Sequence, residues 1–180
     1  MIENVKLARD TYRIRFECSQ IARRSVPGQF LMMRLAGVND PLLGRPVALY
    51  DTVRDAAGNP FAIDIVYLIL GKMTHRLARC RAGDELEIWG PLGNGFPTIA
   101  TDHVIMVAGG IGQTPFYALG QEYLGGRQYG NPPRLMPKAK HATLCYGVRT
   151  ADLLAGVDDF AAAGIDVHIS SDDGTAGHHG

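Results

Sequence analysis

Hydrophobic and polar residues alternate along the first half of the chain. Between residues 3 and 35, apolar positions such as Ile14 and Phe16 are separated by charged ones, which is typical of strands with one buried face. A short helix is predicted only at residues 74–80. Residues 1–98 therefore predict a small antiparallel β-barrel that starts with a meander. Further strands are predicted at residues 45–50, 62–70 and 85–89.

After residue 101 the pattern changes to alternating strands and helices. Such an order predicts a parallel sheet with crossover helices. Residues 125–140 contain three prolines and predict a loop. Residues 99–180 therefore predict an incomplete α/β domain, with about half the elements of a doubly wound sheet. Its strands are predicted at residues 103–108, 141–146 and 166–170, and its helices at 114–124 and 153–163.

A glycine-rich turn separates the first strand of this α/β part from its first helix. Gly109, Gly110 and Gly112 lack side chains where the backbone has to bend and approach a ligand. The helix that follows is expected to point its free N–H groups at a phosphate. The same pattern also occurs in ordinary tight turns, so both interpretations remain open at this point.

Composition excludes several function classes. Lys plus Arg equals Asp plus Glu at 18 each, so we expect no basic surface for nucleic acid or membranes. No stretch approaches the roughly 20 apolar residues that span a bilayer, and we expect a cytoplasmic protein. The three cysteines are far apart and predict buried thiols rather than disulfides or a metal site. His178 and His179 are adjacent and lack the spacing of a helical metal pair.

Two further positions suggest anion binding. Arg45 opens a predicted strand and Thr74 opens a predicted helix, and both are good partners for a pyrophosphate. Alternatively, Arg45 is a solvated surface charge and Thr74 only an N-cap. Together with the glycine-rich turn, they predict anion sites on both parts of the chain, and hence two nucleotides that face each other.

Four motifs in a fixed order resemble the ferredoxin–NADP reductase superfamily across essentially the whole chain. Within it, the chain is most similar to the electron-transfer subunits of dihydroorotate dehydrogenase B, through its Arg-Pro start, its Gly-Lys-x-Thr turn and residues 146–149 followed by 171–174. The four motifs are Arg45-Pro46-Val47-Ala48, Gly71-Lys72-Met73-Thr74, Gly90-Pro91-Leu92-Gly93-Asn94-Gly95-Phe96 and Gly109-Gly110-Ile111-Gly112-Gln113-Thr114-Pro115.

The resemblance implies an FAD site on the barrel. Arg45 would bind the FAD pyrophosphate, and Gly71, Met73 and Thr74 form the turn that would close over the phosphates. The remaining predicted FAD contacts are Pro46, Val47 and Ala48 against the flavin, and Val66, Tyr67 and Leu68 along its ribityl or adenine side.

The resemblance also implies that the glycine-rich turn holds NAD(H), with the nicotinamide over the flavin ring. Gly109, Gly110 and Gly112 would do so together with Thr114 and Pro115. Hydride would then pass between the nicotinamide and flavin N5, and the protein would supply orientation and exclusion of water. We therefore expect no catalytic acid, base or nucleophile.

The chain departs from the superfamily pattern in three ways. Val47 and Ala48 stand where many members place an aromatic residue and a Ser or Thr beside the flavin. The cysteine cluster expected to bind a [2Fe-2S] centre in the full-length subunit has no counterpart here, so we expect no metal ligands in this chain. The C-terminal segment of the full-length subunit, which carries this cluster, is also expected to complete the nicotinamide-binding sheet.

These observations predict an electron-transfer subunit. It would pass electrons from a dihydroorotate-oxidising partner subunit, through FAD and a [2Fe-2S] centre, to NAD⁺ in pyrimidine biosynthesis. The alternatives are another reductase subunit, serving a hydrogenase or oxygenase, and a non-catalytic flavin-binding scaffold.

Three further residues near the strand ends are also candidates. Arg149 is either a cofactor contact or a solvated cation, and Asp172 is either a cofactor contact or part of a turn. Asp152 is predicted to be a helix cap.

Overall fold

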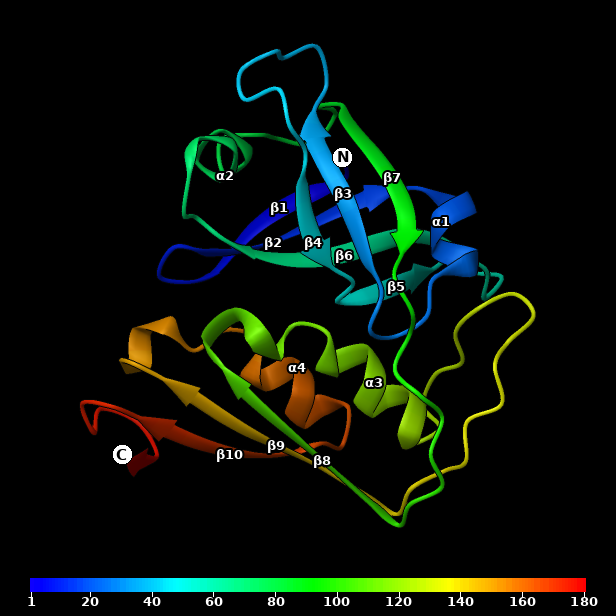
Figure 1. Cartoon of the computed structure of the whole chain (residues 1–180), viewed down its shortest axis with the longest axis vertical. Helices are drawn as coiled ribbons and strands as arrows, with labels where there is room; N and C mark the ends of the chain where they lie inside the picture. The colour runs from blue at the N-terminus through cyan, green and yellow to red at the C-terminus, as the bar shows by residue number, and fades with distance from the viewer.

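The computed structural model describes residues 1–180 as two units stacked along the long axis of the molecule (Figure 1). The first unit, called the barrel below, contains strands β1 to β7, and the second, called the α/β unit, contains β8 to β11. The predicted change from antiparallel to parallel architecture is therefore confirmed. The chain passes between the units after β7, along the irregular residues 93–102.

Two antiparallel sheets form the barrel, in the orders β1-β2-β6-β5 and β4-β3-β7. The predicted opening meander is wrong, because the helix α1 carries the chain from β2 to the other sheet and β2 pairs with β6 instead of β3. Their bounds are β1 Glu3–Ala8, β2 Thr11–Glu17, α1 Ser19–Arg24, β3 Phe30–Leu35, β4 Arg45–Ala48, β5 Asp51–Arg54, β6 Pro60–Leu68, α2 Lys72–Leu77 and β7 Leu86–Leu92.

Alternation along the strands builds the barrel core. Ile14 and Phe16 on β2 point inward with Ile63 and Ile65 on the paired strand β6, and all four are almost fully buried. Between them, Arg15 stays at the surface and donates to both carboxylate oxygens of Asp64 at 2.7 Å. The polar positions that interrupt the apolar pattern thus form cross-strand pairs on the outer face.

The α/β unit contains a parallel sheet in the order β11-β10-β9-β8. Both predicted helices are shorter than expected, because each is preceded by a separate 3₁₀ turn, and Gly156, at φ +74°, interrupts the second. The bounds are β8 His103–Gly109, 3₁₀ Gly110–Gln113, α3 Phe116–Tyr123, β9 His141–Val148, 3₁₀ Ala151–Leu153, α4 Val157–Ala162, β10 Asp166–Ser171 and β11 His178–His179.

Helices α3 and α4 lie between this sheet and the barrel (Figure 1). Tyr50 and Val66 of the barrel are part of the α/β core, so the two units share buried apolar surface. The opposite face of the sheet exposes Ile105 and Val107, which are 61% and 72% accessible. No helix of the structure is long and apolar enough to cross a bilayer.

The three cysteines are more exposed than expected. Cys18, Cys80 and Cys145 are free but only half-buried, so the prediction of buried thiols is wrong. His178 and His179 form the short strand β11 beside β10.

Candidate functional site

A pocket of about 470 Å³, called the barrel pocket below, brings all ten predicted flavin residues together. Its walls come from β4, from the end of β6 and from the turn into α2, with two residues added by the α/β unit. The lining residues are Arg45, Pro46, Val47, Ala48, Val66, Tyr67, Leu68, Leu70, Gly71, Lys72, Met73, Thr74, Ile111 and Thr114.

The wall formed by β4 is the free edge of its sheet. This strand pairs only with β3, so Pro46, which has no N–H to donate, is tolerated there. The Arg45 guanidinium donates to the carbonyls of Leu43 at 3.0 Å and Gly44 at 3.3 Å. It has no carboxylate partner within 4.0 Å, so its positive charge is available to an anion in the pocket.

The turn into α2 forms the opposite wall. Thr74 does not open this helix, which begins two residues earlier at Lys72. Its hydroxyl oxygen instead accepts from the N–H groups of Leu70 at 2.9 Å and Gly71 at 3.1 Å, and so fixes the turn. A Cβ added at Gly71 meets no atom within 4 Å, so the backbone here borders open space.

Three other predicted residues reach the barrel pocket mainly through their backbone. Tyr67 and Met73 are each 3% exposed and pack in the barrel core, where the Tyr67 hydroxyl lies 3.0 Å from Asn4 Oδ1. Burial raises the pKa of Tyr67 above its ordinary value, so this hydroxyl remains protonated. Val66 points the other way, into the α/β core.

A second and larger pocket, called the interface cleft below, has a volume of about 790 Å³ and lies between the two units. The α/β unit contributes the carboxyl ends of β8, β9 and β10, the edge at which open parallel sheets bind ligands. The barrel contributes the turn between β1 and β2 and the end of β6. The lining residues are Arg9, Asp10, Thr11, Leu68, Ile69, Leu70, Gly109, Gly110, Ile111, Tyr146, Gly147, Val148, Arg149, Leu153, Ala155, Ser170, Asp172 and Gly180.

The glycine-rich turn divides between the two pockets. Gly109 and Gly110 line the interface cleft, and Thr114 lines the barrel pocket. Gly112 and Pro115 line neither. Gly110 has φ +52°, a conformation that favours glycine, and a Cβ at either lining glycine meets no atom within 4 Å.

The turn does not lead straight into an α-helix as expected. Residues Gly110–Gln113 of the turn form a 3₁₀ segment, after which Thr114 N–H donates to the Ile111 carbonyl at 3.2 Å, and α3 begins only at Phe116. The free N–H groups of α3 are therefore displaced from the glycines. Any ligand at Gly109 and Gly110 meets the backbone of the turn first.

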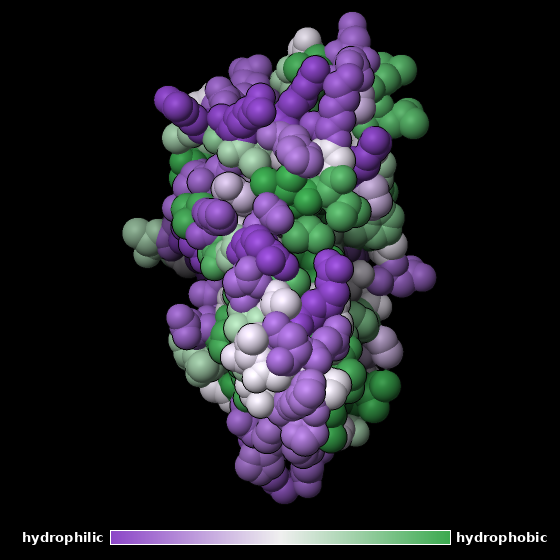
Figure 2. Space-filling view, turned by 90° about the vertical axis from the view of Figure 1, so that its left-hand side faces the viewer, coloured by the Kyte–Doolittle hydropathy of each residue, from purple (hydrophilic) through white to green (hydrophobic).

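The two pockets meet at Leu68, Leu70 and Ile111, which line both. Sequence reasoning did not select Ile111, although an isoleucine between two predicted ligand-binding glycines was an available signal. In the structure Ile111 is 37% exposed. The face that carries α2 and the β1–β2 turn shows apolar side chains at mid-height, between hydrophilic regions (Figure 2). An apolar junction of this kind suits two flat rings in contact.

The structure places the remaining sequence candidates at the cleft. Arg149 lies in its lining, and Asp172 does too, although the latter also belongs to a turn and donates its N–H to the Val148 carbonyl at 3.1 Å. Asp152 pairs with Arg9 of the barrel at 3.0 Å. The sequence had no signal for Arg9, because its partner is far away in the chain and in the other unit.

Comparisons with known proteins agree with this fold. A family model described as "Oxidoreductase FAD-binding domain" matches residues 1–96, which include every barrel strand. The chain is 32% identical to the dihydroorotate dehydrogenase B (NAD(+)) electron transfer subunit of Desulforamulus reducens, over 97% of this chain and 61% of that protein. The electron transfer subunit of the same name from Shouchella clausii is 31% identical over 100% of this chain and 64% of that protein.

Solved structures with the same fold include two reductases. One, described as an NADH-dependent reduced ferredoxin-NADP oxidoreductase in a study of flavin-based electron bifurcation, has a TM-score of 0.78 and 26% identity, over 100% of this chain and 58% of that chain. Phthalate dioxygenase reductase has a TM-score of 0.73 and 18% identity, over 97% and 51%. The chain thus spans about three fifths of the length of its curated relatives.

Proposed function

Since this chain belongs to the family of oxidoreductase FAD-binding domains, we propose that it is an electron-transfer flavoprotein unit that exchanges electrons with NAD(H). The FAD-binding domain would comprise residues 1–98 and the NAD-binding domain residues 99–180. In this assignment FAD occupies the barrel pocket and NAD(H) the interface cleft.

The observation that carries the proposal is the junction of the two pockets at Leu68, Leu70 and Ile111. Two ligands that fill these pockets come into contact there, as direct hydride transfer requires. A binding scaffold for a single nucleotide needs only one of the two pockets. The apolar side chains at the junction also exclude water from the contact.

The barrel pocket fits FAD chemically. Arg45 offers a guanidinium without a carboxylate partner for the pyrophosphate, and Gly71 leaves open space beside the backbone for its oxygens. Val47 and Ala48 present small apolar side chains on the edge strand, where the flavin ring would lie. The flavin, when bound, would supply the redox chemistry, and these residues would hold and orient it.

The interface cleft fits a dinucleotide. Gly109 and Gly110 allow close approach of a pyrophosphate to the backbone, and Arg149 adds a cation at the same sheet edge. Gly112, Thr114 and Pro115 remain predicted contacts of NAD(H). No acid, base or nucleophile is required, because the protein's task is orientation and exclusion of water.

The named relatives suggest the reaction partner. Both are electron transfer subunits of dihydroorotate dehydrogenase B (NAD(+)). We therefore propose that this chain works in a hetero-oligomer with a dihydroorotate-oxidising subunit and passes its electrons to NAD⁺, in pyrimidine biosynthesis. The expected [2Fe-2S] centre stays a prediction about a longer protein.

An absorbance spectrum tests the cofactor and the reaction together. We expect the purified protein to show a flavin band that NADH bleaches under anaerobic conditions. A colourless protein that takes up no added FAD contradicts the proposal, and a flavin band that NADH leaves unchanged favours the scaffold alternative. Reduction of NAD⁺ by dihydroorotate, only when the partner subunit is added, tests the physiological assignment.

A further inference from the structure

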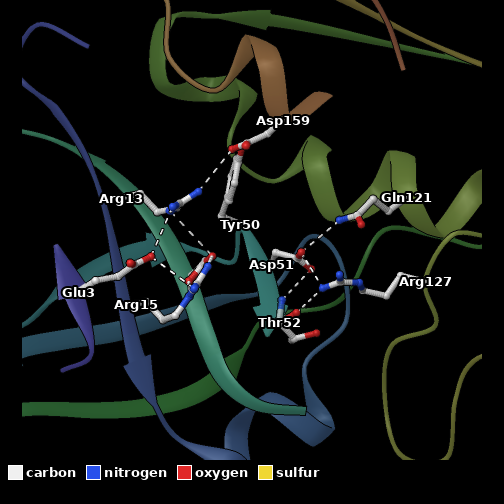
Figure 3. Close-up of polar contacts among 10 residues, drawn as sticks. Glu3, Arg13, Arg15, Tyr50, Asp51, Thr52, Gln121, Arg127 and Asp159 are labelled. Carbon is white, nitrogen blue, oxygen red and sulfur yellow. Dashed lines mark hydrogen bonds and ion pairs between the residues drawn. The ribbon is translucent and has the colours of Figure 1, made fainter. Parts of the chain in front are cut away.

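Tyr50 connects β4, which lines the barrel pocket, to both helices of the α/β unit. It follows β4 after a single residue, and its side chain is 1% exposed. Its hydroxyl donates to Asp159 Oδ2 on α4 at 2.7 Å (Figure 3). Its ring stacks on Tyr117 of α3 with centroids 4.7 Å apart. Burial and the negative charge of Asp159 raise the pKa of Tyr50, so the phenol stays protonated and keeps donating.

The next residue, Asp51, makes a second connection. It is 7% exposed, and its carboxylate accepts hydrogen bonds from Arg127 at 2.7 Å, from the Tyr129 hydroxyl at 2.7 Å and from Gln121 at 3.2 Å. Gln121 belongs to α3 and Arg127 lies in the loop after it (Figure 3). Tyr129 lies in the same loop. One barrel carboxylate thus holds a helix and a loop of the other unit.

Tyr50 and Asp51 both contact the same side of α3. Tyr117 and Gln121 are four residues apart and therefore lie on one face of the helix, where they meet Tyr50 and Asp51 in the same order. Helix α4 is held independently, because Asp159 also lies 3.7 Å from Arg13 of β2. Neither helix can slide along the barrel without breaking a buried contact.

These contacts bear on the junction of the two pockets. β4 forms a wall of the barrel pocket, and the turn that carries Ile111 is joined to α3 by only Thr114 and Pro115. Tyr50 lies one residue beyond β4 and Asp51 is the first residue of β5, and both contact side chains of α3. Since a misplacement of about 1 Å between reacting groups can slow a reaction by about 100-fold, the position of α3 matters for hydride transfer even though neither residue lines a pocket.

We propose that Tyr50 and Asp51 are positioning residues that hold the glycine-rich turn at the distance from β4 required for hydride transfer. This inference rests on the proposed function, because it presumes a nicotinamide in the interface cleft and a flavin in the barrel pocket. Asp159 completes the set as the acceptor for Tyr50. Flavin retention depends on other residues. Loss of the contacts made by Tyr50 and Asp51 should therefore slow hydride transfer without weakening flavin binding.

Three variants test the proposal: Tyr50→Phe, which keeps the stacked ring, Asp159→Ala, and Asp51→Asn, which keeps the volume. We expect each to retain flavin as the wild type does, to bleach with NADH about 10- to 100-fold more slowly, and to lose the long-wavelength charge-transfer absorbance of a nicotinamide stacked on a flavin. Reduction by dithionite, which needs no orientation, should be unchanged in all of them.

The control is Glu87→Gln, which alters an ion pair, Arg34–Glu87 at 2.6 Å, that lies wholly within the barrel and is more exposed than the Asp51 contact. It should bleach at the wild-type rate. If the three variants also bleach at that rate with an intact charge-transfer band, the positioning role is overturned and the proposed function stands. Loss of flavin in parallel with rate overturns it as well, since that indicates damage to the pocket. A wild-type flavin that NADH does not bleach overturns both.

Discussion

The barrel pocket and the interface cleft adjoin each other but are built differently. All residues of the barrel pocket except Ile111 and Thr114 belong to the barrel, whereas the cleft takes its lining from both units. The shape of the first therefore depends mainly on the fold of the barrel, whereas the shape of the second depends on how the two units are held together. Binding of a flavin and its encounter with a nicotinamide are consequently separable properties, and substitutions should affect them separately.

The largest effect is expected at the buried contact between the units. In Arg127→Ala, Asp51 loses its only cationic partner while remaining buried. Removing one partner of a buried pair typically costs about 3 kcal/mol of unfolding free energy or more. The variant should therefore be strongly destabilised, and the cleft, which needs both units, should be lost at lower urea concentration than in the wild type.

The loss of stability in Arg127→Ala should also depend on pH. Burial already raises the pKa of Asp51, and without Arg127 that pKa rises further. A group whose pKa is higher in the folded than in the unfolded state contributes stability at low pH that is lost as pH rises through the folded-state pKa. The deficit in unfolding free energy, measured by urea denaturation, should thus be larger at about pH 8 than at about pH 5.

Lys140→Ala is the control for this prediction. Lys140 pairs with Asp102 at 2.9 Å, but both side chains are more than two thirds exposed. Such surface pairs contribute about 1 kcal/mol or less. An Arg127→Ala variant that loses no more stability than Lys140→Ala, or that shows the same deficit at both pH values, would contradict the role assigned to the buried contact.

In the barrel pocket the largest effect is expected from Arg45. Arg45→Ala removes a charge-assisted contact to the FAD pyrophosphate, worth about 1.5–3 kcal/mol, and should raise the Kd of FAD by about 10- to 100-fold. Titration of the apoprotein with FAD measures this directly. Arg81→Ala, at an exposed arginine outside both pockets, should bind FAD as the wild type does. Equal affinities in the two variants would refute the assignment of Arg45.

The difference between the pockets also explains what the sequence could predict. The barrel pocket was largely predictable, because its residues belong to two short motifs, at residues 45–48 and 71–74, on elements that the alternating pattern indicated. Its errors are local ones, such as the helix starting at Lys72 instead of Thr74. Helix α1 was missed because six residues with only Ile21 and Ala22 buried show no clear helical period.

The interface was not predictable. Arg9 and Asp152, or Asp51 and Arg127, are joined only through the relative placement of two units, and no local pattern encodes that placement. Tyr50 ended the strand predicted at residues 45–50, but nothing in the sequence identified Asp159 as its acceptor. Residues that line a site through their own motif are accessible to sequence reasoning, whereas those that hold two units together require the structure.

Two glycines offer a direct test of separability, with smaller effects. Gly71 borders the barrel pocket and Gly109 the interface cleft, with φ of −149° and −109°, and a Cβ at either meets no atom within 4 Å. Alanine should therefore fold normally at both positions. Because the added methyl group occupies space needed by the ligand, at about 1 kcal/mol or more, Gly71→Ala should weaken FAD binding alone and Gly109→Ala NADH binding alone. Titrations of both variants with both nucleotides check this, and parallel losses of both ligands would mean that the pockets are not separable.

The smallest effect is expected from Arg9→Ala. Arg9 also crosses between the units, and it bonds to Asp152 at 3.0 Å and to Thr150 Oγ1 at 3.3 Å, but Arg9 and Asp152 are each about half exposed. Solvent screens such a pair, so its loss should change the unfolding free energy by about 1 kcal/mol or less. Urea denaturation beside Arg127→Ala compares two cations that cross the same interface and differ mainly in burial. A cost at Arg9 as large as that at Arg127 would show that the cleft side, and not the buried Asp51 contact, fixes the relative position of the two units.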